Sequence, residues 1–269
     1  MHRRNNCHRH LWLLSGTGEG PSIAKAFLSR GWKVSVSLVS SQAALPYLGI
    51  NLEHLWIGSL SGIQEIQEIL KQGRSSNSQF DLVLDATHPF AMQITFDLYH
   101  ACSNLDQQII RFDRSLDSPG WANYISNVEE LSLQNLKQKR FLFAIGARNL
   151  RKGVRSAQKA GAIAFARILP TPEGLREALA SNLCNENLAL LRPSHHKSLG
   201  AYEEALCRKW SITSVVCRQS GGLIQEMWQK ICLKNKLDLW MISRPKNING
   251  LKIIRDIDEI LEKYDYGCN

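Results

Sequence analysis

Short apolar segments alternate with longer amphipathic segments along almost the whole chain, and this alternation constrains the fold more than any other feature. Ten segments have the length and apolar character of buried strands, and they begin at Leu11, Val34, Leu55, Asp81, Gln108, Phe141, Ile163, Leu188, Ile212 and Leu239. Helix-like segments lie between them, among them 21–31, 62–73, 171–182 and 201–210. Since no hairpin signal joins the strands, the pattern predicts parallel sheets covered by helices on both faces.

Ten strands are many for a single sheet. A polar and basic stretch, LQNLKQKR at 133–140, lies near the middle of the chain. We therefore predict an α/β protein with two Rossmann-like domains, parallel sheets and an interdomain cleft. The N-terminal domain, with a glycine-rich nucleotide loop, is expected to span 1–136 and the C-terminal domain 137–269. Ligands of such sheets bind beyond the carboxyl ends of the strands, so the loops that follow the strands are the candidate sites.

The bulk composition narrows the class of partner. The chain has 269 residues and a formal net charge of +9, which favours an anionic ligand. No helix-turn-helix, zinc-finger or RNP signature is present, so we expect a polyanionic small molecule and no nucleic acid. No apolar segment is long enough to cross a membrane and no secretion signal is evident. We expect a cytoplasmic monomer with no membrane partner.

The cysteines and N-terminal histidines give little sign of a metal site. The seven cysteines form no CxxC pair, which is typical of free thiols. His2, Cys7, His8 and His10 could hold a metal ion, but no acidic or cysteine partner lies at zinc spacing. We therefore expect a frayed terminus there and no bound metal.

The first strand runs into a glycine-rich loop, SGTGEG at 15–20, which precedes a helix-like segment. Glycines let a phosphate approach the backbone, and a helix N-terminus supplies unpaired N–H groups. The spacing differs from G-x-G-x-x-G, so a tight turn into the helix remains the alternative. The predicted cofactor contacts are Gly16, Thr17, Gly18, Glu19 and Gly20.

The loop after the second strand bears on the choice of nucleotide. Proteins that prefer NAD usually place Asp or Glu there to hold the ribose 2′-hydroxyl. This chain has Ser40, Ser41 and Gln42, with no carboxylate. The absent acid favours NADP, with Ser40 and Ser41 near its 2′-phosphate, whereas an ordinary serine-rich loop is the alternative.

DATHPF follows the fourth strand. His88 is the candidate catalytic residue, because its ring can donate to a carboxylate or transfer a proton. Thr87 and Pro89 are expected to contact the cofactor. The alternative is that Asp85 and Thr87 cap the following helix, which would also orient His88.

Cationic and polar residues follow strands in both halves and could hold a polycarboxylate through charge-assisted hydrogen bonds. A solvated basic loop is the alternative for each. In the RQSGG loop at 218–222, exposed backbone N–H groups could form an anion-binding nest. The predicted substrate residues are Arg111, Arg148, Arg192, His195, His196, Lys197, Arg218, Ser220 and Gly221.

Seven segments, in order, resemble the precorrin-6A reductase family of cobalamin biosynthesis: SGTGEG, SLVSS, IGSLSG, DATHPFA, RFDR, FAIGARNL and VCRQSGG. The similarity runs from about Leu11 to Pro245. It implies NADPH-dependent reduction of a ring-contracted tetrapyrrole rich in carboxylates, precorrin-6A or its cobalt form, with the cofactor in the interdomain cleft. The resemblance also adds Glu203 to the substrate residues, because it matches a family Glu.

The chain departs from that family at several positions. Ser15 replaces a glycine, the 40–42 loop lacks an arginine, Gln219 replaces Asn or Asp, and Trp228 falls where a Lys is common. Two alternatives therefore stay open. One is an NADP-dependent reductase of another polyanionic substrate, and the other is a tetrapyrrole- or nucleotide-binding module without turnover.

Overall fold

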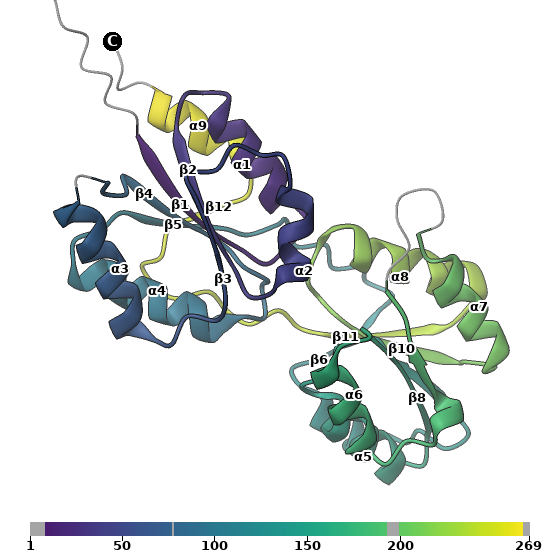
Figure 1. Cartoon of the computed structure of the whole chain (residues 1–269). Helices are drawn as coiled ribbons and strands as arrows, with labels where there is room; N and C mark the ends of the chain where they lie inside the picture. Colours follow the sequence, from purple (N-terminus) through teal and green to yellow (C-terminus); the bar gives the residue numbers. More distant parts are fainter. Residues whose placement is uncertain (1–8, 77, 193–198, 266–269) are drawn as a thin grey trace, which may run out of the picture. The chain divides into compact units, whose positions relative to one another are not determined.

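The computed structural model describes residues 9–76, 78–192 and 199–265, which form two compact units (Figure 1). The first unit contains the described residues up to Arg114 and those from Pro245 onward, and the second contains Ser115–Arg244. The chain therefore crosses between the units twice.

The first unit is built on a parallel sheet. Its strands are β1 (His10–Ser15), β2 (Lys33–Leu38), β3 (His54–Ile57), β4 (Leu82–Ala86), β5 (Ile109–Phe112) and β12 (Ile253–Ile254). Its helices are α1 (Gly20–Leu28), α2 (Ser41–Ala44), η1 (Leu45–Tyr47), α3 (Ile63–Ser75), α4 (Met92–Asn104) and α9 (Ile257–Asp265). The strand order is β12-β5-β4-β1-β2-β3, with every pairing parallel. This order places β1 beside β4, as in Rossmann-type sheets.

The second unit repeats this plan. Its strands are β6 (Asn123–Ile125), β7 (Arg140–Phe143), β8 (Ile163–Ile168), β9 (Leu188–Leu190), β10 (Ser214–Arg218) and β11 (Asp238–Ile242). Its helices are η2 (Val128–Leu133), α5 (Leu150–Lys159), α6 (Pro172–Leu179), η3 (Asn185–Asn187), α7 (Ala201–Lys209) and α8 (Gly222–Asn235). The order β6-β11-β10-β7-β8-β9 is again parallel throughout, with β7 beside β10. The predicted α/β class with two Rossmann-like sheets is confirmed.

The ten predicted strands and the four predicted helices are all present. The pattern does not predict β6 and β12, because strands of three and two residues are too short to show a period. These two strands also make the predicted domain boundary wrong. β6 joins the second sheet before residue 133, and β12 returns to the first sheet near the end of the chain.

The polar stretch 133–140 is a surface turn of the second unit and no linker. Leu131, in η2, and Leu136 are buried, at 0% and 3% exposure. At the other end of the chain, Ile260 and Leu261 on α9 pack into the core of the first unit. Burial of these apolar side chains, which the polar composition around them obscures, decides which unit each segment joins.

The first sheet is buried on both faces. In β1, Leu11 and Leu13 pack with α1 and α9, whereas Trp12 and Leu14 pack with α3 and α4 (Figure 1). The alternation follows the two-residue period of a strand. The buried Trp12 indole N–H donates to the Ser37 hydroxyl at 2.9 Å, so its polar atom is satisfied.

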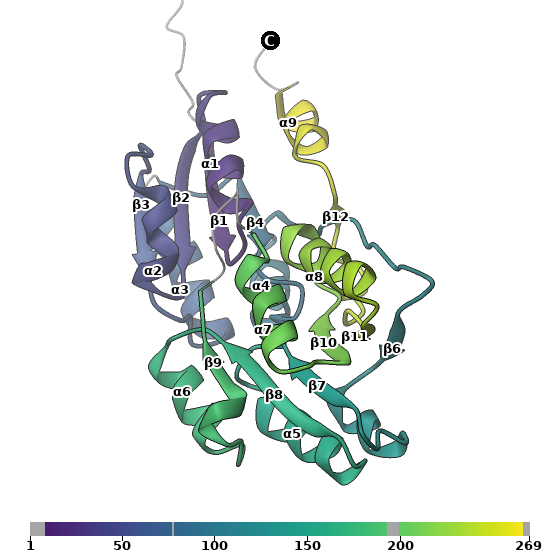
Figure 2. The same ribbon diagram turned by 90° about the vertical axis from the view of Figure 1, so that its right-hand side faces the viewer.

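In the second sheet, α7 and α8 lie on one side and α5 and α6 on the other (Figure 2). Phe143 packs against α5 at Gly153, where a Cβ would come within 2.7 Å of the Phe143 ring. A small residue on this helix therefore lets a large aromatic ring fill the layer between helix and sheet.

Opposite charges lie in register at the ends of β4 and β5, where Asp85 pairs with Arg111. The two side chains form an ion pair with 0% exposure on each side. Thr95 on α4 donates its hydroxyl to Asp85 at 2.7 Å and accepts from Arg111. Because its guanidinium is fully enclosed and bound to Asp85, Arg111 holds the sheet together, and its predicted role in substrate binding is wrong.

Arg111→Met should destabilise the protein strongly, because it leaves the Asp85 carboxylate buried without its cation. We expect the free energy of unfolding to fall by about 3–5 kcal/mol, measured by urea denaturation. Lys33→Met is the matched control. Lys33 and Glu53 form a 3.3 Å ion pair with side chains 44% and 35% exposed, so its loss should cost less than about 1 kcal/mol. Equal stability of the two variants would contradict the structural role of Arg111.

Candidate functional site

The loops after β1 and β4 meet at the point where the order of the strands in the first sheet reverses. From β1 the chain proceeds to β2 on one side, and from β4 to β5 on the other. The Gly16 N–H and the Thr17 hydroxyl both donate to the Ala86 carbonyl, at 3.4 and 3.3 Å. In open α/β sheets the crevice beyond such a switch point is the usual ligand site. The structure thus brings the predicted glycine loop and the DATHPF loop together.

The three glycines of the loop differ in what they pack against. A Cβ at Gly16 would lie 3.3 Å from the His88 backbone nitrogen, and one at Gly20 would lie 1.9 Å from the Ser15 hydroxyl. Both glycines are therefore explained by packing. Gly18 is exposed, and a Cβ there would meet no described atom within 4 Å. Packing within the protein therefore does not require a glycine at this position. A glycine beside a helix N-terminus suits the close approach of a phosphate.

Glu19 is the N-cap residue of α1, and its side chain makes no capping hydrogen bond. It forms an ion pair with Arg114 instead. Burial would raise the pKa of Glu19, but the hydrogen bond and charge of Arg114, helped by a hydrogen bond from Thr17, hold that pKa below its usual value. Sequence reasoning missed Arg114, although it lies in the RFDR segment, because nothing local shows that it reaches α1.

Asp85 organises the loop after β4. Its Oδ1 accepts the Thr87 N–H at 2.9 Å and the Thr87 hydroxyl at 2.6 Å. The N-cap of α4 is Ala91, with no side-chain cap, so the alternative in which Asp85 and Thr87 cap that helix is wrong. Pro89 is buried, so its ring supports the turn.

The half-buried ring of His88 has a defined orientation. Its Nδ1 accepts the Phe90 N–H at 3.2 Å. Since Nδ1 is an acceptor, the neutral ring carries its proton on Nε2. Nε2 is therefore the atom through which His88 can donate.

Ser40 caps the short helix α2, with its hydroxyl accepting the Ala43 N–H at 3.3 Å. Ser41 and Gln42 follow at the exposed start of α2. Ser40 therefore has a structural role in the serine-rich loop. The exposed hydroxyl of Ser41 is not used in that cap, so it could contact a ligand.

The second sheet has its own switch point, at the loops after β7 and β10. A Cβ at Gly146, whose φ is +76°, would lie 3.8 Å from the Arg218 guanidinium. Burial first, and then the positive charge of Arg148, lower the pKa of Arg218. The structure thus brings the predicted Arg148 and Arg218 near each other, and a bound anion would stabilise both charges.

Other predicted substrate residues are engaged within the protein. Gly221, expected to offer its N–H to an anion, donates it to Gln225 at 2.8 Å. Ser220 is buried and contacts the Gly221 carbonyl at 3.5 Å. Glu203 is 0% exposed and pairs with Arg167 at 3.1 Å. An enclosed carboxylate paired with a cation cannot meet a substrate, so the predicted role of Glu203 is wrong.

Of the remaining predicted residues, the structure describes Arg192, which follows β9. Arg192 is exposed. His195, His196 and Lys197 lie outside the described residues.

Two departures from the resembled family have structural explanations. Trp228, at 2% exposure, packs between α8 and the second sheet. The Gln219 side chain donates to Ser118 at 2.8 Å and accepts the Arg244 N–H at 3.1 Å. Both residues support the second unit, so neither departure by itself indicates lost turnover.

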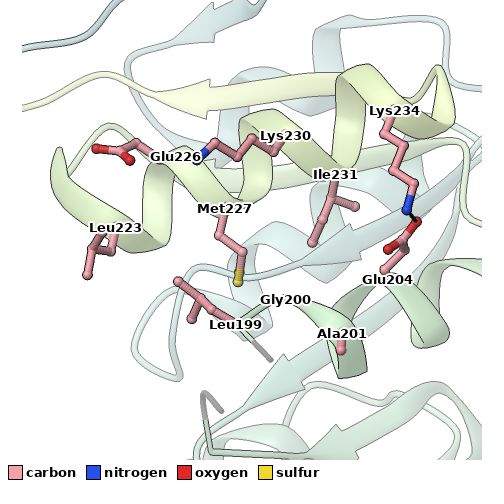
Figure 3. A pocket seen from close by; sticks show the side chains of 10 residues that line it. All are labelled: Leu199, Gly200, Ala201, Glu204, Leu223, Glu226, Met227, Lys230, Ile231 and Lys234. Carbon is pink, nitrogen blue, oxygen red and sulfur yellow. Dashed lines mark ion pairs between the residues drawn. The ribbon is translucent and has the colours of Figure 1, made fainter. Parts of the chain in front are cut away.

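A groove of about 440 Å³ lies between the start of α7 and one side of α8 (Figure 3). Leu199, Met227 and Ile231 give it apolar walls, and Glu204 pairs with Lys234 at 2.9 Å. None of the predicted site residues that the structure describes lines it. It belongs to the helical layer and carries no reactive group of the predicted chemistry.

Within the described ranges, no three histidine, cysteine or acidic side chains gather as metal ligands would. In the same part of the chain, no helix is both long and apolar enough to span a bilayer.

Comparisons with known proteins bear on the family and the fold. A cobalt-precorrin-6A reductase of Synechocystis sp. is 30% identical over 260 residues, covering 93% of this chain and 94% of the relative. A precorrin-6A reductase of Mycobacterium tuberculosis is 27% identical over 241 residues, covering 87% of this chain and 88% of that protein.

A solved structure titled CobK precorrin-6A reductase superposes with a TM-score of 0.74 at 21% identity, covering 96% of this chain and 97% of the other, and so shares the fold. The family model described as Precorrin-6x reductase CbiJ/CobK matches residues 10–265. The chain therefore belongs to the precorrin-6x reductase CbiJ/CobK family.

Proposed function

We propose that this protein reduces precorrin-6A or cobalt-precorrin-6A with NADPH, in cobalamin biosynthesis. Family membership supports the reaction, and the names of the relatives supply the two candidate substrates. The single observation that supports the cofactor is Gly18, in the loop just before α1, an exposed glycine at which a Cβ would meet no described atom within 4 Å. A phosphate needs such open backbone, and a turn that served only the fold does not.

The cofactor residues have separate tasks in this proposal. The backbone at Gly18 and the N-terminus of α1 receive the pyrophosphate. Ser41 and Gln42 lie near the 2′-phosphate, to which a hydroxyl and an amide can donate. When bound, NADPH supplies a hydride to a carbon of the tetrapyrrole.

The substrate is held chiefly by charge. Arg148 and Arg218 bind carboxylates of the tetrapyrrole, whose charge would offset the burial and the repulsion by Arg148 that together lower the pKa of Arg218. Arg192, exposed beyond β9, adds a third guanidinium. His88, with Nδ1 held by the Phe90 N–H, donates from Nε2 to orient the reacting groups or deliver the proton.

Gly18→Val should abolish tight NADPH binding without unfolding the protein. The branched side chain would occupy the phosphate approach, yet its Cβ would meet no described atom within 4 Å. We expect affinity to fall at least about tenfold, with an unchanged melting temperature, by calorimetric titration. Gly120→Val is the matched control, because Gly120 is also exposed with an open Cβ direction. Gly16→Val is a poorer test, since it would press on the His88 backbone.

Ser41→Asp should weaken NADPH by about tenfold, because the carboxylate repels the 2′-phosphate, and should leave NADH binding unchanged. Fluorescence titration of both cofactors measures this. Ser41→Asn, of similar size and no charge, serves as the control. Equal affinity of the wild-type protein for NADPH and NADH would refute the preference for NADPH.

Arg218→Met should raise the KM for the tetrapyrrole by about tenfold or more, because it removes a charge-assisted hydrogen bond. NADPH affinity should stay nearly unchanged, and added salt should reduce the difference from wild type. Steady-state kinetics with thermal melts test this. Arg176→Met is the control, since Arg176 on α6 is 73% exposed and forms an ion pair with Glu173 of the same helix. Wild-type kinetics in a stable Arg218→Met protein would count against the substrate site.

A further inference from the structure

Glu19 places a carboxylate directly beside the backbone that is proposed to receive the pyrophosphate of the cofactor. It lies between Gly18 and Gly20 at the first turn of α1. Its lowered pKa means that it is ionised at neutral pH. An anionic pyrophosphate that approached Gly18 would meet this charge at short range, and like charges repel most strongly where water is partly excluded.

Arg114 offsets that charge. The two side chains form an ion pair, with Arg114 18% and Glu19 32% exposed. The pair is therefore partly shielded from solvent, and its geometry directs the Glu19 carboxylate toward the cation.

The backbone around Arg114 is held firmly. The N–H of the preceding residue, Asp113, donates to the Ile254 carbonyl at 2.9 Å, and its carboxylate accepts the Asn247 side-chain N–H at 3.1 Å. Arg114 follows β5, which is separated from β1 by β4. Its side chain thus connects the loop after β5 to the loop after β1.

We propose that Arg114 is a positioning residue for the cofactor loop. It neutralises Glu19 and holds the carboxylate in place, so that the backbone at Gly18 remains open to an anion. This inference rests on the proposed NADPH function. Arg114 need not touch the cofactor.

The test is calorimetric titration of NADPH into the wild-type protein and four variants. These are Arg114→Met, Arg114→Lys, Glu19→Gln and the double variant Arg114→Met/Glu19→Gln. Arg114→Met should weaken NADPH about tenfold or more, because it leaves an unpaired carboxylate beside the pyrophosphate. Arg114→Lys should stay within about threefold of wild type, since it keeps the charge, and Glu19→Gln should bind at least as tightly as wild type.

The double variant separates electrostatics from structure. If repulsion is the cause, removing the carboxylate as well should restore NADPH affinity to within about threefold of wild type. A purely structural loss would persist or grow. Adenosine 2′-phosphate, which lacks the pyrophosphate, should bind all five proteins alike, and Arg176→Met should match wild type throughout.

The outcomes are distinguishable. Wild-type affinity in folded Arg114→Met, or a double variant as weak as Arg114→Met, would overturn the positioning role while leaving the proposed cofactor intact. Failure of the wild-type protein itself to bind NADPH would overturn the proposed cofactor, and this inference with it.

Discussion

The buried ion pair between Asp85 and Arg111 shapes the part of the first unit where a ligand is expected. Removing two charges from water is costly unless their attraction and further hydrogen bonds compensate. The Asp85 carboxylate is compensated in this way, because it accepts hydrogen bonds from Thr87 and Thr95 as well as from Arg111. One carboxylate therefore joins β4, β5 and α4, and it also fixes the residue before His88. The buried charge thus fixes the start of the loop that carries the candidate catalytic ring, whose Nδ1 accepts the Phe90 N–H.

The glycine loop illustrates how one motif can serve packing and binding together. Gly20 is required by the Ser15 hydroxyl, and Gly16 by the neighbouring loop after β4. Gly18 has no such neighbour among the described residues, so it is the position at which the fold leaves room. Glu19, between the last two glycines of the loop, is balanced by Arg114. The turn alternative accounts for two of the glycines, and the proposed phosphate site needs the third.

The second unit shows why the sequence alone proposes too many substrate-binding residues. A residue after a strand can face solvent or be enclosed, and its position in the chain does not distinguish the two. After β10, the Gly221 N–H is used by Gln225. Glu203, proposed from the family resemblance, lies on α7, where it is enclosed and paired with Arg167. Arg148 and Arg218 remain as a pair of like charges close enough to affect a pKa. Like charges brought together are more informative about an anionic ligand than net charge is.

Local patterns in the chain were enough to predict ten of the strands, the helices between them, the parallel sheets and the glycine loop, because periodicity and turn chemistry are local properties. They also placed DATHPF and the loop at 218–222 at strand ends. Which residues meet depends on the tertiary structure. Glu19 and Arg114 are 95 positions apart, and Asp85 finds Arg111 only through the register of two strands. The unit boundary likewise depends on β6 and β12, whose pairing is long-range. Such contacts arise from the packing of distant segments against one another, and no local pattern of residues contains them.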